Sequence, residues 1–183
     1  FYPTAEQIEK AVTPKTKAVM ICSPNNPTGT MIPKDELEKI AEIVKKHQLW
    51  CLSDEIYCEL LYDGHKHVSI GKFPGMKDYT IIFNGFSKSF AMTGWRIGYI
   101  AAPHDLLVQC CKLHAYSSIC PPIFSQYAAA EGLRSGWAEV EKMRLSYQQR
   151  RNVMYKAFID MGLSCIEPEG AFYMFPDITS TGM

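Results

Sequence analysis

The chain has 183 residues, of which 47% are hydrophobic and 21% are charged, as is typical of a folded globular protein. Its 19 basic residues balance its 19 acidic ones, which argues against a nucleic-acid or membrane-surface partner, and no apolar run has the length of a membrane span. Seven scattered cysteines without a C-x-x-C pair argue against a zinc site or a disulfide framework and favour a cytoplasmic protein with reduced thiols.

The opening residues read like the interior of a longer sequence. The first residue is Phe1 rather than methionine, and "FYPTAEQIEKAV" carries no sign of a signal peptide. The length suits one domain, or one domain plus part of another. We therefore expect a fragment that lacks N-terminal and C-terminal parts of a larger protein.

Short apolar runs alternate with helical patterns along the first hundred residues. The runs of strand length are "AVMIC" (18–22), "LWCLS" (49–53), "TIIF" (80–83) and "IGYIA" (97–101). Continuous apolar runs are typical of strands that helices cover on both faces. This alternation predicts an α/β fold with a largely parallel sheet.

The stretch 33–48 between the first two runs predicts an amphipathic helix. Its apolar residues Leu37, Ile40, Ala41 and Val44 follow the spacing i, i+3, i+4, i+7. Pro33 can open this helix, acidic residues fill its first turn, and basic residues close it. A helix between two strands forms a β-α-β unit, so we expect the first two strands to be parallel.

Helical patterns dominate after residue 101, over 104–115, about 122–135 and about 136–161. The sequence "LSCIEPEGAFYMFPDI" then returns to strand-like character, with Pro168 and Gly170 as turn residues. We expect the longest helix to leave a first domain, residues 1–140, and to lead into a second one that begins within residues 141–183.

Polar loops follow three of the predicted strands. They are "SPNNPTGT" (23–30), "DEIY" (54–57) and "NGFSK" (84–88). Each loop alone is also compatible with ordinary turn or capping chemistry. Ligands of open α/β sheets bind outside the carboxyl ends of the strands, so these loops are candidates for one shared site.

Arg96 lies before the fourth strand rather than after it. Because the connection 84–96 has no helical period, we predict that the fourth strand runs antiparallel. This direction returns Arg96 to the edge of the sheet where Lys88 lies. Asn26, Asp54, Tyr57, Lys88 and Arg96 are then expected to converge on one crevice.

These side chains suit a particular set of ligand groups. Arginine binds phosphate through a planar fork of donors, and a lysine amine in an apolar pocket attacks aldehydes. A carboxylate keeps a pyridine nitrogen protonated, whereas amide and phenol groups suit a phenolate oxygen. An aldehyde, a phosphate, a pyridine nitrogen and a phenolate together describe pyridoxal phosphate.

At these residues the sequence resembles the class I/II pyridoxal-phosphate-dependent aminotransferases of fold type I, the aspartate aminotransferase superfamily. The motifs "SPNNPTGT", "SDEIY" and "SKSFAMTGWRIGY" follow the family's order and spacing, and "EPEGAFYMFPDI" is similar to its approach to the small domain. The resemblance covers essentially the whole chain. It implies a three-layer α/β/α large domain with a mixed, mostly parallel sheet, of which residues 1–140 form part. Residues 141–183 would be the interdomain helix and the start of a small α+β C-terminal domain.

The resemblance also implies a role for each residue. Lys88 would form the internal aldimine with pyridoxal phosphate and move the proton between substrate and cofactor, and Asp54 would pair with the pyridinium nitrogen. Asn26 and Tyr57 would hydrogen-bond the phenolate oxygen, which lowers the pKa of the aldimine. Arg96 would hold the phosphate. No metal is implied.

One position departs from the family pattern. Many members carry a hydroxyl residue three positions before the lysine, where this chain has Gly85. Ser87 could supply a phosphate-binding hydroxyl instead, although a loop serine also bonds readily to its local backbone. Two positions are open for Tyr173, in "GAFYMF": near the substrate in a closed form of the protein, or in the core, which we favour. The phosphate-binding turn, the ring-stacking aromatic and the arginine for the substrate carboxylate would lie outside these residues.

The leading hypothesis for function is transamination between an L-amino acid and a 2-oxo acid through pyridoxamine phosphate. Aspartate or aromatic donors with 2-oxoglutarate as acceptor, and a homodimer, follow from the resemblance. One alternative is a lyase or synthase of the same fold, such as a carbon–sulfur lyase or an aminocyclopropane-carboxylate synthase. A second alternative is a non-catalytic regulatory domain that keeps the fold.

Overall fold

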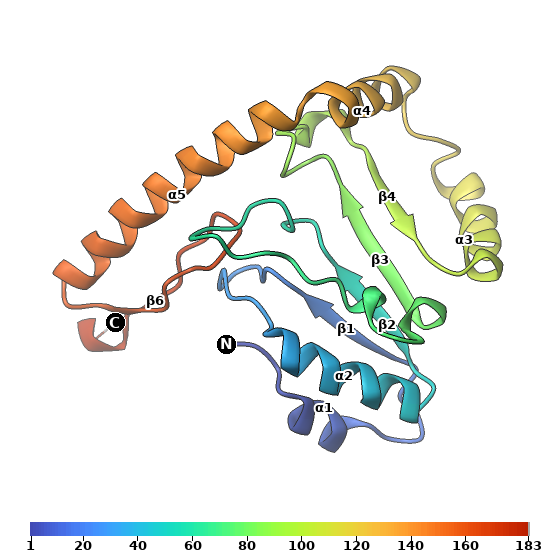
Figure 1. The fold of residues 1–183 in the computed structure, drawn as a ribbon, viewed down its shortest axis with the longest axis horizontal. Helices are drawn as coiled ribbons and strands as arrows, with labels where there is room; N and C mark the ends of the chain where they lie inside the picture. The colour runs from blue at the N-terminus through green and yellow to red at the C-terminus, as the bar shows by residue number, and fades with distance from the viewer. Residues whose placement is uncertain (183) are drawn as a thin grey trace.

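A computed structural model describes residues 1–182, and a four-stranded sheet lies at its centre (Figure 1). The strands are β1 (Ala18–Cys22), β2 (Trp50–Asp54), β3 (Thr80–Gly85) and β4 (Gly98–Ala101), side by side in chain order. The pairs β1–β2 and β2–β3 are parallel, whereas β4 runs antiparallel to β3. The predicted mixed sheet and the predicted antiparallel fourth strand are both confirmed.

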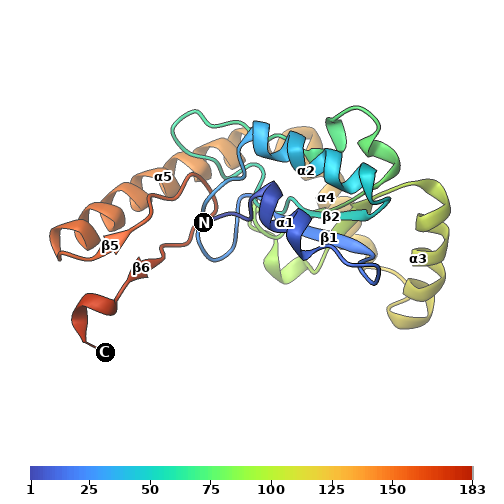
Figure 2. The same ribbon diagram turned by 90° about the horizontal axis from the view of Figure 1, so that it is seen from below.

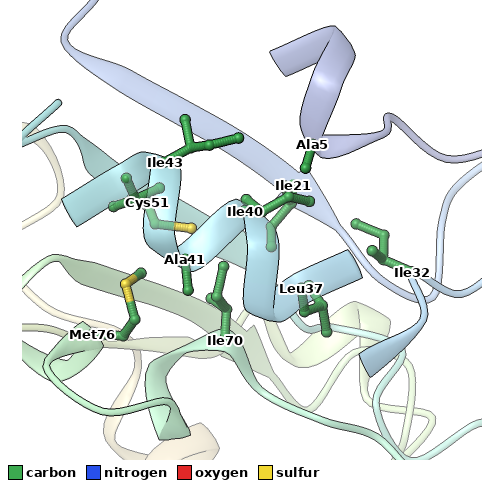
Figure 3. Close-up of a cluster of buried hydrophobic side chains, with 11 residues drawn as sticks. Ala5, Ile21, Ile32, Leu37, Ile40, Ala41, Ile43, Cys51, Ile70 and Met76 are labelled. Carbon is green, nitrogen blue, oxygen red and sulfur yellow. The ribbon is translucent and has the colours of Figure 1, made fainter. Parts of the chain in front are cut away.

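Helix α2 (Lys34–Lys46) covers one face of this sheet (Figure 2). Its predicted apolar face is buried, and Ile40 is 0% exposed. Ile40 packs in one cluster with Ile21 of β1 and Cys51 of β2 (Figure 3). Burial of this apolar stripe against the strands, rather than helix propensity alone, stabilises α2.

A short helix that the sequence reading did not assign, α1 (Ala5–Ala11), lies beside α2. Thr4 opens it with a capping box: its hydroxyl accepts from the Gln7 backbone N–H at 3.2 Å, and the Gln7 side chain accepts from the Thr4 N–H at 3.0 Å. The Ala5 N–H donates to the Glu36 carboxylate at 2.5 Å, which fixes α1 to the first turn of α2.

The opposite face of β1 and β2 carries large apolar side chains that stay exposed. Met20 is 67% exposed and Trp50 is 37% exposed. Because side chains alternate along a strand, Asp54 shares this face with Trp50, four residues before it. The carboxylate of Asp54 therefore lies at the end of β2 on the face opposite α2.

Three longer helices follow the sheet: α3 (His104–Ser117), α4 (Ile123–Ser135) and α5 (Trp137–Asp160). Helix α5 has 24 residues and extends from α4 past the edge of the sheet (Figure 1). The expected boundary at residue 140 falls in its first turn, and the division into two domains stays a prediction.

The chain ends in two short antiparallel strands, β5 (Ser164–Cys165) and β6 (Pro176–Asp177). Four short 3-10 helices complete the secondary structure of residues 1–182: η1 (Ile70–Lys72), η2 (Met76–Asp78), η3 (Thr93–Trp95) and η4 (Thr179–Thr181). Of the helices in this part of the chain, none combines the length and the apolar character needed to cross a membrane.

Candidate functional site

The register of the strands brings three loops to one edge of the sheet. Cys22 pairs with Asp54, and Asp54 pairs with Phe83, so the loops after β1, β2 and β3 leave the sheet together. Gly85 at the end of β3 pairs with Gly98 at the start of β4, so the loop 86–97 leaves and returns at this same edge. All six predicted site residues lie in these loops or at the strand end itself.

The loop after β1 presents Asn26 on a framework of local hydrogen bonds. The Asn25 N–H donates to the Thr30 carbonyl at 2.9 Å, and the Gly29 N–H donates to the Asn25 carbonyl at 2.9 Å. The Thr28 hydroxyl donates to the Asn25 side chain at 2.9 Å. These bonds satisfy the backbone of a tight loop and leave the Asn26 side chain at its exposed tip.

Asp54 is the last residue of β2, and no cationic side chain within residues 1–182 forms an ion pair with its carboxylate. One of its oxygens accepts from the Ile56 N–H at 3.1 Å, and the side chain is half-buried. An acidic group that is fixed by the backbone but has no counter-charge is suited to a cationic ligand.

The side chain of the next residue, Glu55, points away from that of Asp54, and groups within the protein hydrogen-bond its carboxylate. Its carboxylate accepts from the Ser53 hydroxyl at 3.0 Å and from the Ser69 hydroxyl at 2.6 Å, and lies 3.0 Å from His67 Nε2. Burial acts to raise the pKa of Glu55, but the close His67 imidazole and the hydrogen bonds from Ser69 and Ser53 outweigh it and hold that pKa below its usual value. Glu55 is therefore structural, whereas Asp54 is available for a ligand.

Tyr57, Asn26 and Tyr173 meet at the edge of the sheet. The hydroxyl oxygens of Tyr57 and Tyr173 are 2.5 Å apart, and Asn26 Nδ2 donates to the Tyr173 hydroxyl at 3.2 Å. Burial raises the pKa of Tyr57 above its usual value, so its phenol stays protonated. Tyr173 is partly buried against the core cluster of Tyr57, Leu60 and Ala171, in line with the predicted core position. Its hydroxyl also lies between two predicted site residues, 116 and 147 positions away in the sequence.

Lys88 lies beside these aromatic rings. Its Nζ is 6.0 Å from the centre of the Tyr57 ring and 5.7 Å from the centre of the Phe172 ring. No carboxylate within residues 1–182 forms an ion pair with this half-buried amine, which contacts the faces of these two rings instead. Ser87, which precedes it, is also half-buried.

Arg96 ends the 3-10 helix η3 with φ of 50°, in the left-handed region that few residues other than glycine adopt. Its Nη1 donates to the Thr93 carbonyl at 2.9 Å, and its exposed guanidinium has no carboxylate partner in the described part of the chain. One hydrogen bond leaves four of its five N–H groups free to bind an anion.

The structure thus brings Asn26, Tyr57 and Lys88 close together, with Asp54 on the neighbouring strand end. Arg96 lies at the other end of the Lys88 loop. Within residues 1–182, Lys88 and Arg96 form no ion pair with a carboxylate, and Asp54 forms none with a cation. The Asn26 amide and the Tyr57 phenol both hydrogen-bond the hydroxyl oxygen of Tyr173. A ligand with an aldehyde, a phosphate, a ring nitrogen and a phenolate fits this set of groups.

Known proteins with similar sequences share this arrangement of elements. The profile of the family "Aminotransferase class I and II" matches residues 1–182. The whole chain is 52% identical to 47% of a putative aminotransferase of Bacillus subtilis, and 48% identical to 48% of aromatic-amino-acid aminotransferase 2 of Thermococcus litoralis. The solved structure of aspartate aminotransferase from Thermus thermophilus with maleate superposes with a TM-score of 0.93. Its sequence identity is 38%, over 98% of this chain and 47% of that one.

The chain spans about half the length of the curated relatives that it matches. The α/β fold with a mixed, mostly parallel sheet is common to the chain and its structural relatives. Helices cover one face of that sheet within residues 1–182, whereas Met20 and Trp50 on the other face stay exposed.

Proposed function

Because the chain belongs to the class I and II aminotransferase family, we propose that the whole protein transfers an amino group between an L-amino acid and a 2-oxo acid, with pyridoxal phosphate as its cofactor. When bound, pyridoxal phosphate supplies an aldehyde that condenses with amines and a protonated ring that withdraws electrons. The observation that carries the proposal is Lys88, an amine without a carboxylate partner in residues 1–182, beside the Tyr57 ring at the strand edge that Asp54 also reaches.

Lys88 and Asp54 take the central roles in this proposal. Lys88 would hold the cofactor through its Nζ and would move the proton at the substrate Cα, for which a neutral amine is needed. Asp54 holds the proton on the ring nitrogen, because its carboxylate has no other cation within residues 1–182 to neutralise it.

Four further residues orient the cofactor in the proposal. Asn26 and Tyr57 donate hydrogen bonds to the phenolate oxygen, which stabilises its negative charge. Arg96 binds the phosphate with the N–H groups that its bond to Thr93 leaves free, and Ser87 adds a hydroxyl from the turn that carries Lys88. We propose aspartate or an aromatic amino acid as donor and 2-oxoglutarate as acceptor, supported by the names of the relatives.

We also propose that the whole protein is a cytoplasmic homodimer. Exposed apolar side chains on α4 support a partner surface, since Ile123, Phe124 and Tyr127 are each more than half exposed. All seven cysteines are free, which suits a reducing compartment. Sedimentation of the whole protein tests whether it is a dimer, and a monomer at micromolar concentration would contradict the proposed homodimer.

The absorption spectrum of the whole protein tests the cofactor. After incubation with pyridoxal phosphate we expect a visible band that borohydride abolishes and that Lys88→Ala lacks. The control is Lys77→Ala, which removes an exposed lysine of η2 and is expected to leave the band unchanged. A band of normal intensity in Lys88→Ala would refute the role of this lysine.

A screen of single amino acids, without any 2-oxo acid, then separates the possible reactions. A transferase is expected to lose the visible band stoichiometrically and to release one 2-oxo acid per site. A lyase would restore the band and release ammonia over many turnovers, and a regulatory domain would leave the band unchanged with every amino acid.

A further inference from the structure

Tyr173 lies where the two predicted donors to the phenolate oxygen meet. We propose that Tyr173 is a positioning residue of the cofactor site, whose hydroxyl donates to Tyr57 and thereby directs the Tyr57 proton toward the phenolate oxygen of the cofactor. This inference rests on the function proposed above, and it concerns a residue that the sequence had led us to place in the core.

The direction of the hydrogen bonds follows from the chemistry of the three groups. Asn26 Nδ2 can only donate, so the Tyr173 oxygen, 3.2 Å away, accepts from it. The proton of Tyr173 is then free for the Tyr57 oxygen at 2.5 Å. In this arrangement the Asn26 amide and the Tyr173 hydroxyl each have an acceptor, and the Tyr57 proton is left to bind a third group.

The burial of Tyr57 makes this third group important. Tyr57 is 3% exposed, so bulk water does not provide a ready acceptor for its proton. A phenolate oxygen at the site would accept both this proton and the second N–H of Asn26. Because hydrogen bonds in a chain polarise one another, a bond received from Tyr173 makes Tyr57 a stronger donor.

Backbone contacts hold the segment that carries Tyr173 against the site. The Gly170 N–H donates to the Gly29 carbonyl at 3.0 Å, and the Ala171 N–H donates to the Leu60 carbonyl at 2.9 Å. A Cβ atom at Gly170 would come within 2.7 Å of the Pro24 side chain, so this approach requires glycine. Tyr173, two residues further on, is thus fixed to the loops after β1 and β2.

The rings around Tyr173 support its position independently of the hydroxyl. Its ring centre is 5.6 Å from that of Tyr57 and 5.0 Å from that of Phe172. Tyr173→Phe keeps these ring contacts and removes only the hydroxyl. The variant therefore isolates the hydrogen bond, and a thermal melt of the whole protein checks that the fold is retained.

The test is a pH titration of the visible absorption of the bound cofactor in the whole protein. If Tyr57 is a weaker donor in Tyr173→Phe, the negative charge on the phenolate is less stabilised and the titration midpoint rises. We expect a rise of about 0.5 to 1 unit, the effect of one hydrogen bond on a proton equilibrium. Tyr57→Phe is expected to raise the midpoint at least as far, and both variants should bind pyridoxal phosphate more weakly.

The double variant Tyr57→Phe/Tyr173→Phe shows whether Tyr173 acts through Tyr57. If it does, the midpoint of the double variant equals that of Tyr57→Phe alone. A wild-type midpoint in Tyr173→Phe, or additive shifts in the double variant, would overturn the inference and leave the proposed cofactor intact. Absence of the visible band in the wild-type protein would instead overturn the proposed function, and this inference with it.

Discussion

Replacing Gly85 by alanine should displace the loop that carries Lys88 and Arg96. A Cβ atom at Gly85 would lie 2.9 Å from Gly98 Cα and 3.2 Å from the Ile97 carbonyl oxygen. Both neighbours are backbone atoms at the start of β4, so neither can rotate away as a flexible side chain can. Alanine must therefore push apart β3 and β4 at the point where the loop 86–97 begins and ends.

The expected size of the effect follows from overpacking. An extra methyl group in a well-packed site costs about 1–3 kcal/mol. If the strands stay paired, the free energy of unfolding falls by this amount, as urea denaturation of the whole protein measures. If the loop moves instead, the same energy weakens cofactor binding by about 5- to 150-fold in Kd.

Gly94→Ala is the matched control, because it adds the same methyl group in the same loop. A Cβ atom at Gly94 meets nothing within 4 Å. We expect stability and cofactor affinity within about 0.5 kcal/mol of the wild-type values. Unchanged stability and affinity in Gly85→Ala, or equal losses in both variants, would refute the importance of the Gly85–Gly98 approach.

Two further predictions concern the core and the buried acid. Ile40→Ala empties a fully buried position of α2 and should lower the free energy of unfolding by about 2–5 kcal/mol, whereas the exposed Lys34→Ala on the same helix should change it by less than about 0.5 kcal/mol. Glu55 has a folded pKa below its usual value of 4.5, so the stability it contributes is present above that pH and is lost as the pH falls through the folded pKa. Glu55→Gln should therefore lower the free energy of unfolding at neutral pH by about 1–3 kcal/mol and flatten the acid side of the stability curve. An unchanged acid side would contradict the role of the contacts with His67 and Ser69.

The sequence was sufficient for features that depend on local pattern. The helix around Ile40 and the continuous apolar runs of the strands followed from periodicity and length alone. The antiparallel β4 followed from the lack of a helical period before Arg96. Helix α1 could also have been predicted, since Thr4 and Gln7 have the spacing of a capping box.

Features that depend on tertiary contacts could not be predicted from the sequence. Tyr173 lies in an apolar stretch and gave no local signal, because the partners of its hydroxyl come from loops after β1 and β2. In the same way, Asp54 and Glu55 are adjacent acids in the sequence, and only the structure shows that Ser53, Ser69 and His67 satisfy the second one. Polar contacts between side chains that the fold brings together, rather than local propensity, decide both assignments.

The role of Lys88 as the residue that holds the cofactor is the central claim, and peptide mapping tests it most directly. Whole protein incubated with pyridoxal phosphate is treated with borohydride, digested and analysed by mass spectrometry. We predict one modified peptide, the one that contains Lys88, with a mass increase equal to one reduced pyridoxyl-phosphate group. A modification at another lysine while Lys88 stays unmodified, or no modified peptide at all, would contradict the account.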